Sequence, residues 1–335
     1  MKILINGGGN IGTTIANLMI KFKDILGISH IYLHKNLPQK WRDTDLNFFK
    51  KSGVIVCEEE NISHKEVLRD VHFIFESTSN GIGLQNKEKY KSLENLIGVC
   101  AQGSEKGFGI PFMTGINENK ILGEKFVQVV SCNTHASLSL LNTFSRRNFS
   151  KVLHSDFVVV RRSEDIGNHE RLVTANVVAR HLNPDIGTHH AIDVSDLLET
   201  IGVKIPISSS DITTPSQLLH SIRFNIKLNQ KVSQTSIDDM LRNSHYTSTT
   251  NKFDSNHIFE LGRRYGFQGR IYSHAIIVNN NIMIHDDTTI KGWAFVPQEG
   301  NTLISTIHSF LLQTKNTNSK ELLKKISDEL LIKKW

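Results

Sequence analysis

Cys132 is the residue whose type and setting point most directly to chemistry. An apolar run over 126–130 ends just before it, and a helix-like segment follows from Ala136. A thiol at the start of a helix faces the positive end of the helix dipole, which stabilises the thiolate and lowers the thiol pKa. We therefore expect Cys132 to be a nucleophile at neutral pH. The other cysteines, Cys57 and Cys100, lie inside strand-like runs and fit the hydrophobic core.

A second chemical signature stands near the N-terminus, where the strand-like run Lys2–Asn6 leads into Gly7-Gly8-Gly9-Asn10-Ile11-Gly12. Gly7, Gly9 and Gly12 occupy the glycine positions of G-x-G-x-x-G, and an apolar helix pattern follows. In this motif the first glycine permits a tight turn, the second lets the backbone approach a pyrophosphate, and the third lets the helix lie close to the strand. The helix start supplies N–H donors. A strand before and a helix after the motif predict a dinucleotide site.

The end of the second expected strand bears on which dinucleotide is preferred. It reads His30-Ile31-Tyr32-Leu33-His34-Lys35, without the carboxylate that NAD sites usually carry for the ribose hydroxyl. Lys35 and His34 stand there instead, and a cation favours the 2′-phosphate of NADP. The alternative is that Lys35 is a solvated loop lysine. We expect NADP to be preferred, with NAD possible.

These residues need a scaffold to position them. Over 1–131, short β-branched runs alternate with helix-like stretches, which predicts a dinucleotide-binding domain with a doubly wound parallel sheet of Rossmann type. From 132 to 300 the strand candidates follow one another with few helices, which predicts an α+β catalytic domain on a mixed or antiparallel sheet. The last segment, 301–335, has an amphipathic helical pattern and is expected to pack back on the N-terminal domain.

Composition narrows the class of protein. The chain has 335 residues, with 39 Lys and Arg against 33 Asp and Glu, so that its net charge is +6. No apolar run approaches the roughly 18 residues that span a bilayer, and the start lacks the pattern of a secretory signal. Three scattered cysteines fit neither a disulfide framework nor a C-x-x-C metal site, which favours a cytoplasmic location. Lys and Arg are dispersed, without the motifs of nucleic-acid readers, so small anionic ligands are the preferred partners.

Six segments, taken in order, resemble the landmarks of archaeal-type (class II) phosphorylating glyceraldehyde-3-phosphate dehydrogenase. They are Asn6–Gly12, Ala101–Gly103, Val130–Thr134, Val160–Arg162, Thr188–His190 and Leu261–Arg263. Each segment alone is weak evidence for the resemblance, but together the segments cover nearly the whole chain. The resemblance implies that Cys132 attacks an aldehyde, that hydride passes to a nicotinamide, and that inorganic phosphate releases the resulting thioester. It also implies a homotetramer.

The resemblance assigns further residues by position. His220, in Leu218-Leu219-His220, occupies the place of the general base. Cofactor contacts fall on the glycine motif together with Asn10 and Ile11, on Gly103 after Gln102, and on Arg162. The residues expected at the substrate and phosphate are Ser131, Asn133, Thr134, Arg161, His189 and His190. The double histidine could suggest a metal, but we expect none because no third ligand stands at a suitable spacing.

Several positions depart from the family pattern. His135 replaces a usual Thr, and Ala191 a usual Gly. The amide that fixes the nicotinamide ring would have to come from Gln298 or Asn301, or be missing.

Two other hypotheses about the function stay open. One is an acyl-phosphate reductase of the semialdehyde dehydrogenase type, which also pairs a Rossmann domain with a Ser-Cys-Asn nucleophile. The other, with thin sequence support, is a basic nucleic-acid-binding protein.

Overall fold

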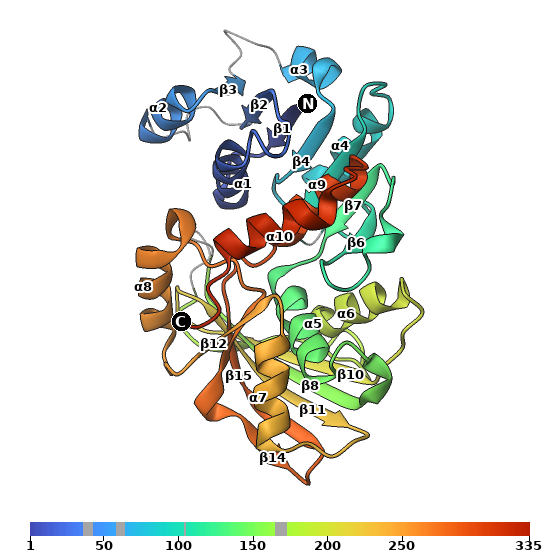
Figure 1. The fold of residues 1–335 in the computed structure, drawn as a ribbon, viewed down its shortest axis with the longest axis vertical. Coiled ribbons are helices and arrows are strands. Elements are labelled where there is room, and N and C mark those ends of the chain that lie inside the picture. The colour runs from blue at the N-terminus through green and yellow to red at the C-terminus, as the bar shows by residue number, and fades with distance from the viewer. Residues whose placement is uncertain (36–42, 58–63, 104, 165–172) are drawn as a thin grey trace. The chain divides into compact units, whose positions relative to one another are not determined.

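The computed structural model describes residues 1–35, 43–57, 64–103, 105–164 and 173–335. The chain divides into two compact units (Figure 1). The first unit comprises Met1–Val130 and Leu303–Glu329, and the second comprises Ser131–Thr302 and Leu330–Trp335.

The first unit is built on a parallel sheet with the strand order β3-β2-β1-β4-β5-β7-β6. Its strands are β1 (Lys2–Asn6), β2 (His30–His34), β3 (Val54–Cys57), β4 (Phe73–Glu76), β5 (Gly98–Gln102), β6 (Ile110–Phe112) and β7 (Phe126–Val129). Its helices are α1 (Asn10–Lys21), α2 (Asp43–Lys51), α3 (His64–Asp70), α4 (Ile82–Lys91), α9 (Leu303–Gln313) and α10 (Ser319–Leu330).

The strand order of this sheet reverses between β1 and β4. Asn6, the last residue of β1, is paired in register with His34 of β2 and with Glu76 of β4. β1 reads as a continuous apolar run because helices cover both faces of a parallel sheet, and Ile3, Leu4 and Ile5 are accordingly buried. In open α/β sheets, ligands bind beyond the carboxyl ends of the strands at such a reversal. The glycine motif begins at this point.

Helix α9 contributes to the core of the first unit although it comes from the C-terminal part of the chain. Every residue of α9 is buried, and the ring of Phe310 lies 4.9 Å from that of Phe73 and 5.8 Å from that of Phe75. The Gln313 amide donates hydrogen bonds to main-chain carbonyls, among them that of Val99 in β5. These contacts hold α9 against the sheet.

The second unit is built on a mixed sheet with the order β12-β13-β15-β11-β8-β10-β9, in which β14 pairs with β15. β8 runs parallel to β10 and antiparallel to β11. The strands are β8 (Val152–Arg161), β9 (Val177–Val178), β10 (Ile207–Thr213), β11 (His220–Leu228), β12 (Thr247–Thr250), β13 (Ala275–Val278), β14 (Met283–His285) and β15 (Thr289–Val296). The expected fold class, a Rossmann-type parallel sheet plus a second domain on a mixed sheet, is confirmed.

The second unit has more helices than the sequence predicted. They are α5 (Cys132–Phe144), α6 (His189–Glu199), α7 (Gln234–Asn243) and α8 (Ser255–Tyr265). α5 packs over β8, β11, β13 and β15 and contacts α6 and α7. These helices are rich in Ser, Thr, Asn, Asp and His, whose intrinsic helix propensity is modest, and packing against the sheet stabilises them.

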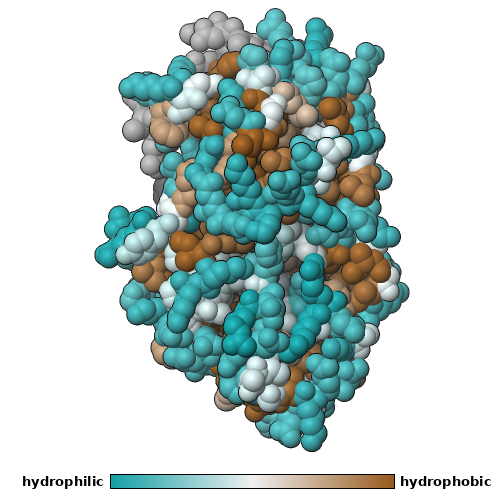
Figure 2. Space-filling model, in the orientation of Figure 1, coloured by the Kyte–Doolittle hydropathy of each residue, from teal (hydrophilic) through white to brown (hydrophobic). Residues whose placement is uncertain are grey.

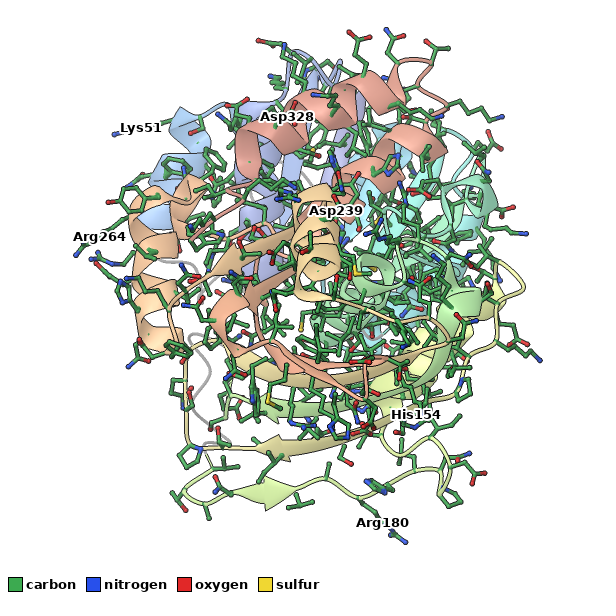
Figure 3. All side chains as sticks on the ribbon, turned by 60° about the horizontal axis from the view of Figure 1, so that its bottom comes forward. Lys51, His154, Arg180, Asp239, Arg264 and Asp328 are labelled. Carbon is green, nitrogen blue, oxygen red and sulfur yellow. The ribbon has the colours of Figure 1, made fainter. Side chains whose placement is uncertain are left out.

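The surface is predominantly polar on the face shown in Figure 2, with smaller hydrophobic groups scattered among hydrophilic residues. Figure 3 places Arg264 on the outer side of α8. Arg264 and its neighbour Arg263 each bind Glu260 with an Nε–O distance of 2.7 Å. One carboxylate thus offsets only one of the two positive charges of this pair. Among the described residues, no helix is both long and apolar enough to cross a bilayer.

Candidate active site

The glycine turn after β1 has the geometry that a dinucleotide requires. Gly7 has φ +110°, and a Cβ atom there would lie 2.5 Å from the main chain of Ser77. A Cβ at Gly12 would lie 1.7 Å from the Gly7 carbonyl oxygen. Packing within the protein therefore explains these two glycines. At Gly9, by contrast, no described atom lies within 4 Å of the Cβ position, so packing leaves room for a ligand to approach this backbone.

The N-terminus of α1 adds to this fit. Gly9 is its N-cap and, without a side chain, makes no side-chain hydrogen bond to the helix start. Asn10 and Ile11 are the first two residues of α1. Gly103 follows β5 with φ +74° and open space around its Cβ position. The residues present therefore fit a bound dinucleotide.

Two histidines lie at the carboxyl end of β2. His34 Nδ1 is 2.8 Å from Asn6 Oδ1, and the His34 ring stacks on His64 with centroids 3.8 Å apart. Burial, together with the proximity of His64, lowers the pKa of His34 to about 4, so His34 is neutral at pH 7. Lys35 is half-buried, and the residues after it, 36–42, lie outside the described part of the chain. The cation expected here is therefore Lys35.

Cys132 is the first residue of α5, with Ser131 as the N-cap. The Ser131 hydroxyl accepts a hydrogen bond from the Thr134 N–H at 3.4 Å and pairs with the Thr134 hydroxyl at 2.9 Å. Ser131 and Thr134 therefore fix the helix start, and Thr134 is fully buried. The Cys132 side chain is partly exposed, whereas Cys57 and Cys100 are buried and burial raises the pKa of both thiols to about 12.

The residues after Cys132 are enclosed. Asn133 is buried, and its Oδ1 has no hydrogen-bond partner among the described residues. His135 lies with Nδ1 3.1 Å from the Ser131 carbonyl oxygen, so this nitrogen carries the proton and donates. Its ring meets that of buried His274 edge-on, with centroids 5.0 Å apart. The residue that replaces the usual Thr thus bonds the cap of α5.

Arg161 is the last residue of β8 and Arg162 follows it, but the two side chains have different surroundings. The Arg161 side chain is 41% exposed and its Nη1 lies 3.8 Å from Asp211 Oδ1. The Arg162 guanidinium is buried, and its Nη2 donates to Glu299 Oε1 at 2.5 Å. Arg161 can therefore reach a solvent-borne anion, whereas the guanidinium of Arg162, predicted to contact the cofactor, is held inside the second unit.

His220, the first residue of β11, is buried beside the end of β8. Its Nδ1 accepts the main-chain N–H of Arg162 at 2.9 Å. Because that N–H can only donate, the neutral ring carries its proton on Nε2. Burial and the charges of Arg162, Arg161 and His190 lower the pKa of His220 well below its usual value. The Gln298 side chain lies along the ring, with its Nε2 3.0 Å from the ring Nε2, and because both nitrogens carry protons in this tautomer the contact is not a hydrogen bond.

His189 and His190 begin α6, and their rings lie 4.0 Å apart between centroids. Burial, followed by the proximity of His190, lowers the pKa of His189 to about 4. His190 is buried, with Nε2 3.5 Å from Asp211 Oδ2. Asp211 comes from β10, and the spacing of the sequence did not reveal it as a neighbour of the histidine pair.

The sequence also did not reveal which residues the segment Pro297–Asn301 after β15 contacts. Glu299 bonds Arg162, and its Oε2 lies 3.7 Å from Arg270 Nη1. The Asn301 amide donates to the carbonyl oxygens of Cys132 and His274, each at 2.9 Å. The two amides considered for the nicotinamide, those of Gln298 and Asn301, are both buried. The sequence did indicate a different role for this segment, because it departs from the family pattern.

The structure therefore brings Arg161, Arg162, His190 and His220 to one end of the second sheet. Cys132 begins the helix that packs on the same sheet. The glycine turn, Lys35 and Gly103 belong to the first unit.

Comparison with known proteins gives one consistent name. No protein-family model matches the chain. A curated glyceraldehyde-3-phosphate dehydrogenase of Saccharolobus solfataricus is 26% identical over an alignment of 357 residues, covering 100% of this chain and 98% of that protein. One from Saccharolobus islandicus is 23% identical over the same shares of both chains, and one from Metallosphaera sedula is 26% identical over 72% of this chain and 70% of its own. The chain is thus similar along its whole length to proteins named glyceraldehyde-3-phosphate dehydrogenase.

Proposed function

We propose that the chain is a phosphorylating glyceraldehyde-3-phosphate dehydrogenase of the archaeal (class II) type. It would oxidise glyceraldehyde 3-phosphate with inorganic phosphate to 1,3-bisphosphoglycerate, reversibly, through a thioester on Cys132. The observation that carries the proposal is the position of Cys132, the partly exposed first residue of α5, in a chain similar over its full length to proteins of that name.

The chemistry on Cys132 has two stages, oxidation of the aldehyde to a thioester and then transfer of the acyl group to phosphate. The thiolate attacks the aldehyde carbon, forming a C–S bond and an alkoxide. As the alkoxide collapses to a thioester, the carbon loses a hydride, which carries two electrons. A nicotinamide dinucleotide, when bound, supplies the acceptor for that hydride. A phosphate oxygen then attacks the thioester carbon, the C–S bond breaks, and the acyl phosphate leaves Cys132 as a thiolate.

His220 is the residue that we assign to proton handling. A buried ring with its proton on Nε2 is a hydrogen-bond donor toward an oxyanion. To accept a proton as a general base, His220 would have to give up the bond from the Arg162 N–H. We therefore propose that His220 stays neutral throughout and stabilises the alkoxide as a hydrogen-bond donor.

We assign anion recognition to Arg161, at the exposed end of the sheet of the second unit. The half-exposed Arg161 guanidinium can meet a phosphate oxygen with two parallel N–H donors. His189 and His190 remain assigned to the substrate, and Arg162 acts through its N–H on His220 and through the charge it presents there. Ser131, Asn133 and Thr134 would hold the start of α5 in the geometry that the thioester needs.

The cofactor would be held through Gly7, Gly9, Asn10, Ile11 and Gly12, with Gly103 beside it. We propose a preference for NADP, because Lys35 is the cation at the carboxyl end of β2 and His34 is neutral. We further propose a homotetramer in the cytoplasm, as the family resemblance implies.

The decisive experiment is a kinetic comparison of NADP and NAD with glyceraldehyde 3-phosphate, with and without phosphate or arsenate. The proposal expects reduction of the dinucleotide to require the oxyanion and to vanish in Cys132→Ser. Lys35→Ser should lower kcat/KM for NADP more than for NAD. Full activity of Cys132→Ser would overturn the assignment. Preference for an aspartyl or glutamyl phosphate in a substrate panel would favour a semialdehyde-dehydrogenase-type reductase instead.

A further inference from the structure

A cluster of metal-ligand type lies in the second unit and is not used as such by the proposed reaction. His189, His190 and Asp211 each offer one donor atom, and these atoms lie within 4.8 Å of one another. His190 is 3% and Asp211 3% exposed. Both ring nitrogens of His190 and Oδ1 of Asp211 lack a hydrogen-bond partner among the described residues. Buried polar atoms without a partner are costly, so these atoms point to a ligand.

The donor set identifies the chemical class of that ligand. Imidazole nitrogens with a carboxylate oxygen are typical of Zn²⁺, with bonds of about 2.0–2.2 Å, so neighbouring ligand atoms in a tetrahedron are about 3.3–3.6 Å apart. The distance from His190 Nε2 to Asp211 Oδ2 is 3.5 Å, which matches such an edge. A carboxylate among the donors disfavours direct contact of all three side chains with an anion, so the anionic substrate assigned to His189 and His190 would meet them through the bound cation. The nearest cation is Arg161, whose Nη1 lies 3.8 Å from Asp211 Oδ1. Its side chain is half-exposed and can therefore turn into solvent when a metal ion binds.

Main-chain contacts fix the two elements that supply the donors. Gly187, with φ +90°, passes so close to β10 that a Cβ there would lie 2.0 Å from the Ser209 carbonyl oxygen. The Thr188 N–H donates to that carbonyl at 2.9 Å. The Ser209 hydroxyl accepts the Ala191 N–H at 3.0 Å, so β10 caps the start of α6. The donors are therefore held together by the fold before any ion binds.

We propose that His189, His190 and Asp211 form a binding site for a divalent transition-metal cation of the Zn²⁺ type. The three protein ligands leave one position of a tetrahedron for water or an anionic oxygen. The sequence argued against a metal because no third ligand stands near the histidine pair, and the fold supplies that ligand from β10. The proposal does not depend on the dehydrogenase assignment, since it concerns binding alone.

The test uses the full-length protein after dialysis against a chelator. Co²⁺ is titrated while its visible absorption is followed, and Zn²⁺ is titrated by calorimetry. We expect one ion per chain, with the intense Co²⁺ bands of tetrahedral geometry, in the wild type and in Cys132→Ser. Asp211→Asn and His190→Gln should each weaken Zn²⁺ binding at least about tenfold, since even residues that only support metal ligands are worth 10–100-fold.

Two further variants keep the test falsifiable. His189→Gln alters a partly exposed side chain, so it reports on ligation if the buried variants fail to fold. His285→Gln is the matched control, because His285 pairs with Asp286 at 3.0 Å on the exposed surface, and its Zn²⁺ affinity should equal that of the wild type. No bound ion at 100-fold excess of metal over about 1 μM protein, or equal affinity in wild type and His189→Gln, would overturn the proposal.

Discussion

The side-chain amide of Asn301 donates a hydrogen bond of 2.9 Å to the main-chain carbonyl of Cys132, the first residue of α5. It donates a second to the carbonyl of His274, also at 2.9 Å. Asn301 is fully buried and follows directly on the segment whose Gln298 and Glu299 contact His220 and Arg162. One short stretch after β15 therefore contacts Cys132, His220 and Arg162.

Asn301→Ala should destabilise the second unit and impair catalysis. The substitution removes donors from two buried carbonyls, and each loss costs about 1–3 kcal/mol. We expect the free energy of unfolding in urea to fall by about 2–4 kcal/mol and kcat to fall as the start of α5 loosens. The exposed Asn280→Ala should stay within about 0.5 kcal/mol of the wild type. An unchanged unfolding curve for Asn301→Ala would remove Asn301 from this role.

Two glycines of the same turn should respond differently to alanine. Gly9→Ala adds a Cβ to open space, so the protein should keep its melting temperature but bind NADP and NAD at least about tenfold more weakly, since the methyl group occupies the proposed pyrophosphate position. Gly12→Ala sets a Cβ against the Gly7 carbonyl and should lower the melting temperature itself. Calorimetry of unfolding and of ligand binding separates the effects. Unaltered dinucleotide affinity in Gly9→Ala would argue against the site.

The glycine turn could be predicted because its signals are local. The strand, turn and helix follow one another within about 20 residues, and each has its own periodicity or punctuation. The same holds for Cys132, which was expected at the start of a helix and is the first residue of α5. Helices α6, α7 and α8 of the second unit were missed because their composition alone favours other structures, and burial against the sheet decides their conformation.

Asp211 and Glu299 could not be predicted as neighbours of the histidine and arginine pairs. Asp211 reaches His190 only because β10 pairs with β8 and binds the start of α6. Glu299 reaches Arg162 from 137 positions along the chain. Pairings of this kind depend on strand register and chain reversal, which a local pattern does not contain. The tautomer of His220 was equally hidden, since it depends on a main-chain N–H of another strand.

Native alkylation should single out Cys132. Iodoacetamide reacts with thiolates, and burial both shields Cys57 and Cys100 and raises their pKa to about 12. At pH 8 we expect mass spectrometry to find one adduct, on Cys132, and three adducts after unfolding in urea. Cys132→Ser should remain unlabelled while native. Equal labelling of Cys57 or Cys100 in the native protein would contradict their burial.

His308 should make the first unit less stable as the pH falls from about 6.5 toward 4. It lies in buried α9 with Nδ1 3.0 Å from the Thr114 hydroxyl, and burial lowers its pKa to about 4. In that window the unfolded chain binds a proton that the folded chain does not, so the free energy of unfolding decreases as acid is added. At 1.36 kcal/mol for each pH unit, the full window is worth up to about 3 kcal/mol.

The variant His308→Gln isolates this share of the pH dependence. Glutamine can still bond the Thr114 hydroxyl but does not titrate, so its loss of stability between pH 7 and pH 4.5 in urea should be smaller than that of the wild type by about 2 kcal/mol. The exposed His257→Gln on α8 serves as the control and should follow the wild-type curve. If His308→Gln also follows the wild-type curve, His308 already binds its proton in the folded protein, and its burial in α9 does not oppose protonation.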